Sequence, residues 1–524
     1  MILRDILEFA ASRYPENTAM ADGDRRYSYA EWNERVNKVA NALRNLGVEK
    51  GDRVVQIIKN REENCAIHFA CQKIGAVNTP INFRWAGDEI EYCVGDAKPS
   101  LVVLEEATSE TVLSARDHFD SNPTLLFVGE NAPDGVPAFD EAVGAAETSR
   151  HEEEIEDSDA ALMLYTSGTT GRPKGAPRSQ KAEYAATVGQ LVEHRYSLGE
   201  KTLGVMPLYH TMGMHSLTGM VSINGLFVCM PDWNAEEALK IIEREKLTCL
   251  YLIPTIFHDL VNHPAFDEYD TSSVKKISYA GAPMLSGLVE KCIEKFDPEV
   301  FVNHYGSTEV YIFATYPKPW EKPGCSGRAA FHTDLRVVRA DPDPTVRPDE
   351  TLPPDESGEI IVRLSDDAFR GYYNRPEATE KAIRDGWYFT GDTGHLDEDG
   401  DLWVSGRVDD MINTGGENVY PVEVEDVLSR HPDIAEVAVV GLPDERWGHA
   451  VTAFVVPKRM DLTEEDIDEY CRESASLARF KRPKKVVFVE EIPKSPVGKL
   501  LRRMLVAGEY EETKPLATDK GEAR

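Results

Sequence analysis

A glycine- and threonine-rich segment, Tyr165-Thr-Ser-Gly-Thr-Thr-Gly-Arg-Pro-Lys-Gly175, carries the clearest chemical signal in the sequence. Glycines let backbone N–H groups turn toward one point, and hydroxyl and ammonium groups add donors for an anion. The spacing is not the GxxxxGK[ST] pattern of P-loop nucleotidases, because Gly175 follows Lys174 directly. The segment predicts a cradle for a polyphosphate, made by Thr166, Ser167, Gly168, Thr169, Thr170, Gly171 and Lys174.

Further segments of similar polarity follow in order along the chain. They are Tyr279-Ala-Gly-Ala-Pro283, Asn303-His-Tyr-Gly-Ser-Thr-Glu309, Trp387-Tyr-Phe-Thr-Gly-Asp-Thr-Gly394, Gly406-Arg-Val-Asp-Asp410 and Pro493-Lys-Ser-Pro-Val-Gly-Lys499. The ordered set resembles the adenylate-forming superfamily of acyl-CoA synthetases, luciferases and peptide-synthetase adenylation domains, from about residue 5 to about residue 508. The segments Met206-Pro-Leu-Tyr-His210 and Leu477-Ala-Arg-Phe-Lys-Arg-Pro-Lys484 look especially like those of benzoate-type aryl-CoA ligases, the 4-chlorobenzoate enzymes among them.

The resemblance implies an ATP site. Its adenine slot would be formed by Gly281, Ala282, Pro283, His304, Tyr305 and Gly306. Glu309 would ligate Mg²⁺, a hard cation that prefers carboxylate and phosphate oxygens, and Thr308 would touch the α-phosphate. Asp392 would accept hydrogen bonds from both ribose hydroxyls, assisted by Arg407.

The reaction implied by the resemblance has two halves. A carboxylate first attacks the α-phosphorus to give an acyl-adenylate and pyrophosphate, with Lys499 stabilising the developing charge. A thiol then displaces AMP after the C-terminal domain has rotated about a hinge that matches Asp409. Gly415 and Gly416 would enter the site at this stage, since residues without side chains let a pantetheine arm pass.

The thiol is expected to be coenzyme A. In the related ligases its nucleotide end would contact Phe480, Arg482, Lys484, Trp447 and Arg84, and arginine can bind phosphate through two hydrogen bonds. In isolation the basic run Phe480-Lys-Arg-Pro-Lys-Lys485 could equally be a solvated charge cluster. A carrier protein is the alternative thiol donor, and luciferase-like oxidation of the adenylate is a remote third outcome.

The acid is expected to be a benzoate-type compound, benzoate or 4-hydroxybenzoate. The pocket positions implied by the resemblance are His210, Thr211, Met212, Tyr251, Ala280, His304 and Tyr311. His304 and Tyr311 replace an aliphatic residue and a methionine of the chlorobenzoate enzyme, and such polar groups could bond a ring hydroxyl. His304 could instead lie along the adenine wall. A medium- or long-chain fatty acyl-CoA synthetase and a non-catalytic nucleotide-binding regulator are the competing interpretations.

Alternating patterns must position these segments. Helical spacing is expected over residues 27–48 and 62–74, and strands near 52–58, 101–104, 125–128, 247–252 and 276–279. The resemblance implies an α/β fold in which residues 1–408 form a large N-terminal domain of two αβ-layered subdomains plus a small β-barrel. Residues 409–524 would form a mobile C-terminal α+β domain.

Composition limits the partners. Of 524 residues, 58 are Lys or Arg and 91 are Asp or Glu, which gives a net charge of −33. So acidic a surface argues against nucleic acid as a partner and favours a halophilic, salt-adapted protein. The eight scattered cysteines and the charged N-terminus indicate a reduced, cytoplasmic protein. The uncharged stretch 202–231 contains Pro207, Asn224 and two histidines, so no membrane span is expected, and a homodimer is left open.

Overall fold

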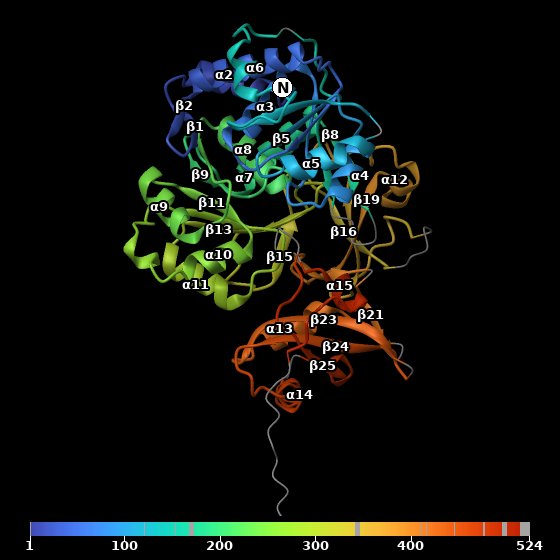
Figure 1. Ribbon diagram of the computed structural model, residues 1–524. Coiled ribbons are helices and arrows are strands. Elements are labelled where there is room, and N and C mark those ends of the chain that lie inside the picture. Colours follow the sequence, from blue (N-terminus) through green and yellow to red (C-terminus); the bar gives the residue numbers. More distant parts are fainter. Residues whose placement is uncertain are drawn as a thin grey trace, which may run out of the picture. The chain divides into compact units, whose positions relative to one another are not determined.

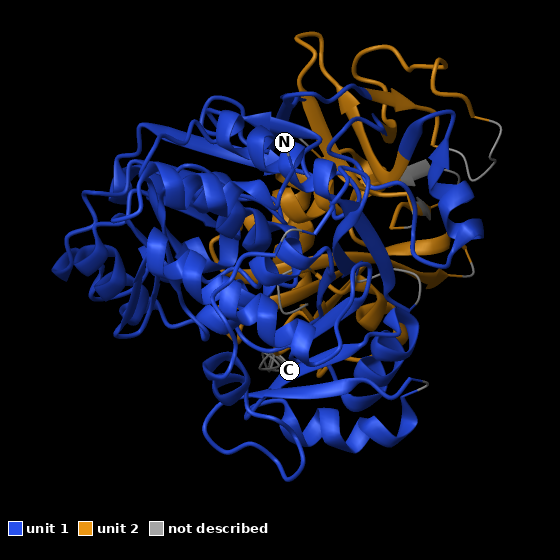
Figure 2. Ribbon diagram, turned by 90° about the horizontal axis from the view of Figure 1, so that it is seen from above, with its two compact units in different colours: residues 1–335, 362–388 blue, residues 336–361, 389–524 orange. Residues whose placement is uncertain are grey.

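The computed structural model describes residues 2–119, 121–151, 153–166, 172–340, 346–408, 410–414, 417–444, 446–474, 477–494 and 500–513. The chain divides into two compact units (Figure 2). Unit 1 comprises residues 1–335 and 362–388, and unit 2 comprises residues 336–361 and 389–524. This division differs from the expected boundary at 408/409, because β20 (Leu402–Arg407) packs against α13 (Pro421–Ser429) within unit 2.

A six-stranded sheet forms the first layer of unit 1. Its strands are parallel except for the last pair, and their order is β6 (Thr124–Val128), β5 (Leu101–Glu105), β3 (Arg53–Ile57), β4 (Val77–Pro80), β7 (Ala160–Thr166) and β8 (Lys174–Ser179). Buried Val, Leu and Ile side chains fill both faces of these strands, as expected of a parallel sheet covered by helices.

The second sheet of unit 1 is longer. Its order is β15 (Cys325–Ala329), β14 (Ala314–Tyr316), β13 (Val300–Tyr305), β12 (Lys276–Tyr279), β11 (Cys249–Leu252), β9 (Lys201–Gly204), β10 (Leu226–Cys229), β1 (Thr18–Asp22) and β2 (Arg25–Ser28). Strands β11, β12 and β13 are parallel in register, so their carboxyl ends meet at one edge. Ligand sites in such sheets lie at this edge.

The helices of unit 1 lie against these sheets, and α9, α10 and α11 are seen beside β11 and β13 in Figure 1. They are α1 (Asp5–Arg13), α2 (Tyr29–Asn45), α3 (Glu62–Ile74), α4 (Gly87–Ala97), α5 (Ser109–Ala115), α6 (Phe139–Gly144), α7 (Gln180–Glu193), α8 (Thr211–Ser222), α9 (Ala235–Glu245), α10 (Pro254–Val261), α11 (Ser286–Phe296) and α12 (Pro376–Ala382). Helix α2 begins at a capping box in which Ser28 and Glu31 satisfy each other's backbone N–H groups. The helices and strands expected from periodicity are confirmed to within a few residues.

Unit 2 contains two groups of strands. The first is the run β16 (Leu335–Val338), β17 (Gly358–Arg363), β19 (Trp387–Leu396) and β20, which lies mostly in unit 2. The two-residue strand β18 (Ile383–Arg384) and the first two residues of β19, with which it pairs, belong to unit 1. This run occupies the segment in which a small β-barrel was expected. The second is a five-stranded sheet of β21 (Ile412–Thr414), β22 (Glu417–Val419), β23 (Ile434–Asp444), β24 (Gly448–Pro457) and β25 (Lys485–Phe488), accompanied by α13, α14 (Glu464–Glu473) and α15 (Arg502–Ala507).

The predicted α/β class is confirmed. The uncharged stretch 202–231 forms buried β9, α8 and β10, as its composition suggested. Among the described residues, no helix has the length and hydropathy needed to cross a membrane.

Candidate functional site

The two ends of the predicted phosphate loop are held together by a strand pair. Thr166 ends β7, Lys174 begins β8, and the two residues are direct partners in the antiparallel ladder. Residues Ser167, Gly168, Thr169, Thr170 and Gly171, the predicted cradle between them, lie outside the described residues. The loop therefore starts and ends at one edge of the six-stranded sheet.

Lys174 of the predicted phosphate cradle and Glu309, the predicted magnesium ligand, both contact one tyrosine, Tyr372. Nζ of Lys174 lies 4.3 Å from the centre of the Tyr372 ring, and the hydroxyl of Tyr372 donates a 2.6 Å hydrogen bond to Oε1 of Glu309. The Glu309 residue is only 6% exposed, so this bond forms in a largely desolvated place. No motif of the sequence singled out Tyr372 for this role.

A tight turn presents Thr308 and Glu309. The backbone N–H of Ser307 donates to the carbonyl of Val310, and the Ser307 hydroxyl accepts from the N–H groups of Glu309 and Val310. A Cβ atom at Gly306 would lie 1.9 Å from the carbonyl oxygen of Tyr311, so only glycine fits there. The turn follows β13 at the carboxyl edge of the long sheet.

The predicted adenine segments leave neighbouring strands. Tyr279, the last residue of β12, pairs with Asn303 of β13, so Gly281, Ala282 and Pro283 emerge at the same edge as His304, Tyr305 and Gly306. Gly281 has φ +84°, a left-handed conformation that other residues adopt only with strain. The topology thus brings the two segments to one place, as the resemblance required.

The predicted ribose pair forms within unit 2. Asp392 and Arg407 are partners on β19 and β20, and Nη1 of Arg407 donates to Oδ1 of Asp392 at 2.6 Å. Arg407 also donates to the carbonyl of Thr390 at 3.1 Å. The guanidinium therefore fixes the orientation of the Asp392 carboxylate.

Three aromatic rings of the predicted acid region pack together with a fourth, unpredicted ring in the core of unit 1. Tyr251, His304 and Tyr311 are 1–3% exposed, and a fourth ring, His194, is fully buried beside them. The ring centres of His194 and Tyr251 are 4.7 Å apart, and those of His304 and Tyr311 are 4.8 Å apart. The hydroxyls of Tyr311 and Tyr251 lie 3.5 Å apart.

Both ring nitrogens of His304 are engaged by the protein. Nε2 donates to the carbonyl of Tyr311 at 3.1 Å, and Nδ1 lies 3.0 Å from Nε2 of His194. Burial lowers the pKa of His304 to about 4, so the ring is neutral and its Nδ1 accepts from His194. No nitrogen of this ring remains for a substrate hydroxyl, contrary to the role considered for it. His194 ends α7 outside any motif, and no pattern in the sequence singled it out.

Three of the four remaining acid-pocket positions lie at the start of α8, and the fourth follows β12. His210 is the N-cap residue of α8, Thr211 and Met212 begin its first turn, and Ala280 follows β12. Sδ of Met212 would lie 3.9 Å from a Cβ atom placed on Gly281, so this turn reaches the adenine segment. The predicted acid and nucleotide positions are therefore adjacent.

Basic and aromatic residues of the predicted coenzyme A region gather within unit 2. Nζ of Lys484 lies 5.5 Å from the Trp447 ring, burial lowers the pKa of Lys484, and Phe480 is 39% exposed. A hollow of about 520 Å³ in the same unit is lined by Cys471, Arg472, Leu477, Arg479 and Arg482. Three arginines in one hollow of so acidic a protein suit a phosphorylated ligand.

Other predicted residues are less completely placed. Arg84 of unit 1 donates to the hydroxyl of Tyr209 at 3.2 Å and faces the Phe83 ring. Lys499, Asp409, Gly415 and Gly416 lie outside the described residues.

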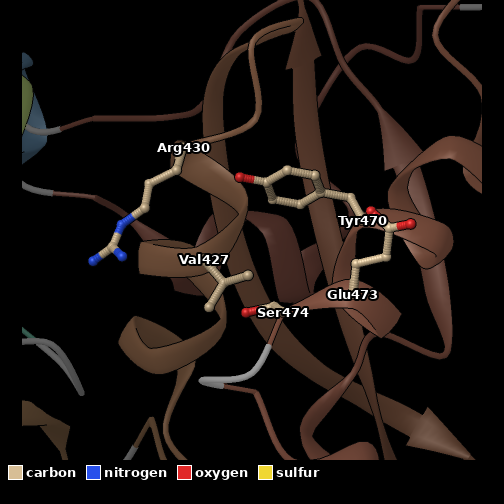
Figure 3. A pocket seen from close by; sticks show the side chains of 5 residues that line it. All are labelled: Val427, Arg430, Tyr470, Glu473 and Ser474. Carbon is tan, nitrogen blue, oxygen red and sulfur yellow. The ribbon is translucent and has the colours of Figure 1, made fainter.

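A second hollow of unit 2, of about 250 Å³, is lined by Val427, Arg430, Tyr470, Glu473 and Ser474 (Figure 3). The side chains come from the ends of α13 and α14. Its lining contains none of the predicted site residues.

The donor set around Glu309 fits a magnesium ion. The hydrogen bond from Tyr372 uses Oε1, and the second carboxylate oxygen suits a hard cation shared with phosphate oxygens. The nearby Lys174 carries the positive charge that the nucleotide phosphates require.

Known proteins resemble the chain over almost its whole length. The AMP-binding enzyme family matches residues 7–373, and the AMP-binding enzyme C-terminal domain matches residues 423–499. An indoleacetate–CoA ligase of Aromatoleum aromaticum is 34% identical over 97% of this chain and 98% of its own. A long-chain-fatty-acid–CoA ligase of Mycobacterium tuberculosis is 33% identical, covering 94% and 95%, and a 4-chlorobenzoate–CoA ligase of an Arthrobacter species is 33% identical, covering 96% and 94%.

Solved structures agree. An anthranilate CoA ligase in complex with anthranoyl-AMP superposes with a TM-score of 0.88 at 27% identity, covering 97% of each chain. ATP-bound MatB from Rhodopseudomonas palustris superposes with a TM-score of 0.87 at 27% identity, covering 97% of this chain and 99% of its own. The chain belongs to the AMP-binding enzyme family and is an AMP-forming acid–CoA ligase, with ATP and CoA among its substrates.

Proposed function

We propose that this ligase activates a small aromatic carboxylic acid of the benzoate type, benzoate or 4-hydroxybenzoate, in a magnesium-dependent reaction. The observation that carries the proposal is the buried group of Tyr251, His304, Tyr311 and His194, whose rings fill the expected acid region. Rings packed against one another favour a short, flat slot, because a long alkyl tail would need the space that they occupy.

Among the polar atoms of these four rings, the two tyrosine hydroxyls are the groups that could hydrogen-bond a hydroxyl on the substrate ring. His304 bonds Tyr311 and His194 through its two nitrogens, whereas the Tyr251 and Tyr311 hydroxyls are 3.5 Å apart. Two such hydroxyls can share a further hydroxyl between them. A 4-hydroxybenzoate preference would therefore depend on the tyrosines.

In the first half-reaction, Glu309 would hold Mg²⁺ and Lys174 would neutralise the nucleotide phosphates. Mg²⁺ supplies charge neutralisation on the phosphate oxygens when it is bound. Tyr372 keeps the Glu309 carboxylate oriented, and Asp392, held by Arg407, accepts the ribose hydroxyls. Lys499 is proposed to stabilise the charge that develops during attack on the α-phosphorus.

In the second half-reaction, coenzyme A is proposed to bind through the basic hollow of unit 2. Arg482 and Lys484 would contact its phosphates, Trp447 and Phe480 its base, and Arg84 would complete the site. Rotation of residues 409–524 about Asp409 would bring Gly415 and Gly416 to the thiol channel.

A fatty acid is the second candidate, because one relative with 33% identity is a long-chain-fatty-acid–CoA ligase. Pyrophosphate release with ATP and Mg²⁺ in high KCl, with and without CoA, separates the two. The acids are benzoate, 4-hydroxybenzoate, 4-chlorobenzoate, cinnamate, octanoate and palmitate. We expect the benzoates to give the highest kcat/KM with acceleration by CoA. Preference for octanoate or palmitate would overturn the aromatic proposal.

A further inference from the structure

Arg178 is a fully buried arginine that none of the roles above uses. It lies on β8 four residues after Lys174, and the side chains of Lys174, Ala176 and Arg178 share one face of that strand because strand side chains alternate. The side chain of Arg178 and that of its ion-pair partner Glu183 are both 0% exposed. A buried charge of this kind is retained only where its hydrogen bonds are satisfied.

The guanidinium of Arg178 bonds the segment that carries the proposed metal ligand. Its Nη1 donates to the carbonyl of Thr308 at 3.1 Å and to that of Glu309 at 3.2 Å. Its Nε donates to Glu183, which lies on α7. The backbone of the Thr308–Glu309 turn is therefore held by the charged guanidinium of Arg178.

The same guanidinium fixes the segment that carries Tyr372. Its Nη2 donates to the carbonyl of Asp367 at 2.7 Å, and the N–H of Phe369 donates to the carbonyl of Glu309 at 2.8 Å. These bonds tie the 365–372 segment to the Thr308–Glu309 turn. Consequently one side chain sets the relative position of the Glu309 carboxylate and its hydroxyl donor, Tyr372.

Glu183 keeps the guanidinium oriented. Burial alone would raise the pKa of Glu183, but Arg178 and His215 outweigh burial and hold this pKa below its ordinary value. Nε2 of His215 lies 3.5 Å from Oε2 of Glu183. The carboxylate is thus ionised at neutral pH, where it pairs with Arg178.

We propose that Arg178, oriented by Glu183, is a positioning residue that prearranges Glu309 and Thr308 for the metal–nucleotide complex. The proposal rests on the proposed role of Glu309 as the magnesium ligand. Lysine could keep the charge but lacks the planar fork that reaches three carbonyl groups and a carboxylate together. Loss of such supporting partners lowers metal affinity by roughly 10–100-fold.

The test measures Mn²⁺ binding by electron paramagnetic resonance in the presence of α,β-methylene-ATP, a readout independent of turnover. The variants are R178K and the double variant R178M/E183L, which removes both buried charges and so avoids leaving one unpaired. We expect Mn²⁺ affinity to fall about tenfold or more in both. We also expect the half-saturating Mg²⁺ concentration for pyrophosphate release to rise in parallel, with little change in the KM for the acid.

The matched control is R35K, which alters a second arginine of unit 1 that pairs with a buried glutamate, Glu62, away from the Thr308–Glu309 turn. It should leave Mn²⁺ affinity unchanged even where it lowers Tm. An R178M/E183L protein with native Tm and native Mn²⁺ affinity would overturn the proposal. If R178M/E183L fails to fold, unchanged Mn²⁺ affinity in E183Q would likewise overturn the proposal.

E309Q distinguishes the two levels of inference. If E309Q binds Mn²⁺ normally, the proposed metal role of Glu309 fails. If E309Q loses Mn²⁺ whereas R178K and R178M/E183L retain it, only the positioning role of Arg178 fails.

Discussion

The hydroxyl of Tyr372 donates a 2.6 Å hydrogen bond to Oε1 of Glu309, and the ring of the same tyrosine faces Nζ of Lys174 at 4.3 Å. Tyr372 thus connects the start of β8, where Lys174 lies, to the turn after β13 that carries Glu309. The bond orients a carboxylate in a largely desolvated place, where a wrong rotamer would cost a charge–dipole interaction.

Replacing Tyr372 by phenylalanine should therefore weaken the use of Mg²⁺ without removing the ring from Lys174. We expect the half-saturating Mg²⁺ concentration for pyrophosphate release to rise roughly tenfold, as for other lost partners of metal ligands. The neighbouring change Tyr373→Phe, in which the residue hydrogen-bonds Gly175 through its backbone, is the matched control. Equal Mg²⁺ dependence in both variants would refute the role of the Tyr372 hydroxyl.

Lys499→Ala should separate the two half-reactions. Loss of a charge that acts only during adenylation should slow pyrophosphate release on the order of 10²–10³-fold. Thioester formation from supplied acyl-adenylate and CoA should be nearly unaffected. Lys494→Ala, which breaks an exposed 2.6 Å pair with Glu436, serves as the control. Equal losses in both half-reactions would exclude rotation about Asp409 as proposed.

Arg482→Ala should raise the KM for CoA selectively. A charge-assisted hydrogen bond to phosphate contributes about 1.5–3 kcal/mol, so the rise should be about tenfold or more. The KM values for ATP and the acid should not change. Arg430→Ala, which removes an exposed arginine paired with Asp426 at the other hollow, tests for a general charge effect (Figure 3). If both variants bind CoA equally, the basic hollow is not the CoA site.

His304→Ile combined with Tyr311→Met should raise the turnover of 4-chlorobenzoate relative to 4-hydroxybenzoate. The apolar pair removes the Tyr311 hydroxyl, which would otherwise lie unpaired against chlorine. The double variant should also unfold more easily, because His194 loses the acceptor of its hydrogen bond. An unchanged ratio of 4-chlorobenzoate to 4-hydroxybenzoate turnover would show that His304 and Tyr311 do not select the acid.

Acid should destabilise the fold through its buried histidines. Burial lowers the pKa of His304, His215 and His68 to about 4 each, and that of His194 well below its ordinary value. The unfolded chain takes up these protons near pH 6.5, whereas the native protein does not until about pH 4, so stability falls as pH falls through this window.

For His304 alone, the free energy of unfolding should drop by about 2 kcal/mol between pH 7.5 and 5. Urea unfolding of wild type and His304→Gln at pH 7.5 and pH 5 measures this drop in the free energy of unfolding. The drop between the two pH values should be smaller in the variant. His258→Asn, at an exposed histidine of α10, should match wild type. A pH effect of the same size in His304→Gln would rule out this histidine as a source.

The sequence alone determined the fold class and the order of the site. Periodicity located α2, α3 and the strands around them, since one-sided burial imposes a repeat that is local in the chain. The motifs located Lys174, Gly281, Glu309, Asp392 and Arg407. A glycine such as Gly281, required by a positive φ, can be recognised at a single position of the sequence.

The tertiary structure alone decided which side chains share a bond. Tyr372 and Glu309 lie 63 residues apart, and Arg178 and Thr308 lie 130 residues apart, so no local pattern could pair them. His304 had been considered as an acid contact, but His194, 110 residues away, engages its Nδ1. A hydrogen bond depends on the positions that packing gives to distant strands, and those positions are set by the whole core rather than by neighbouring residues.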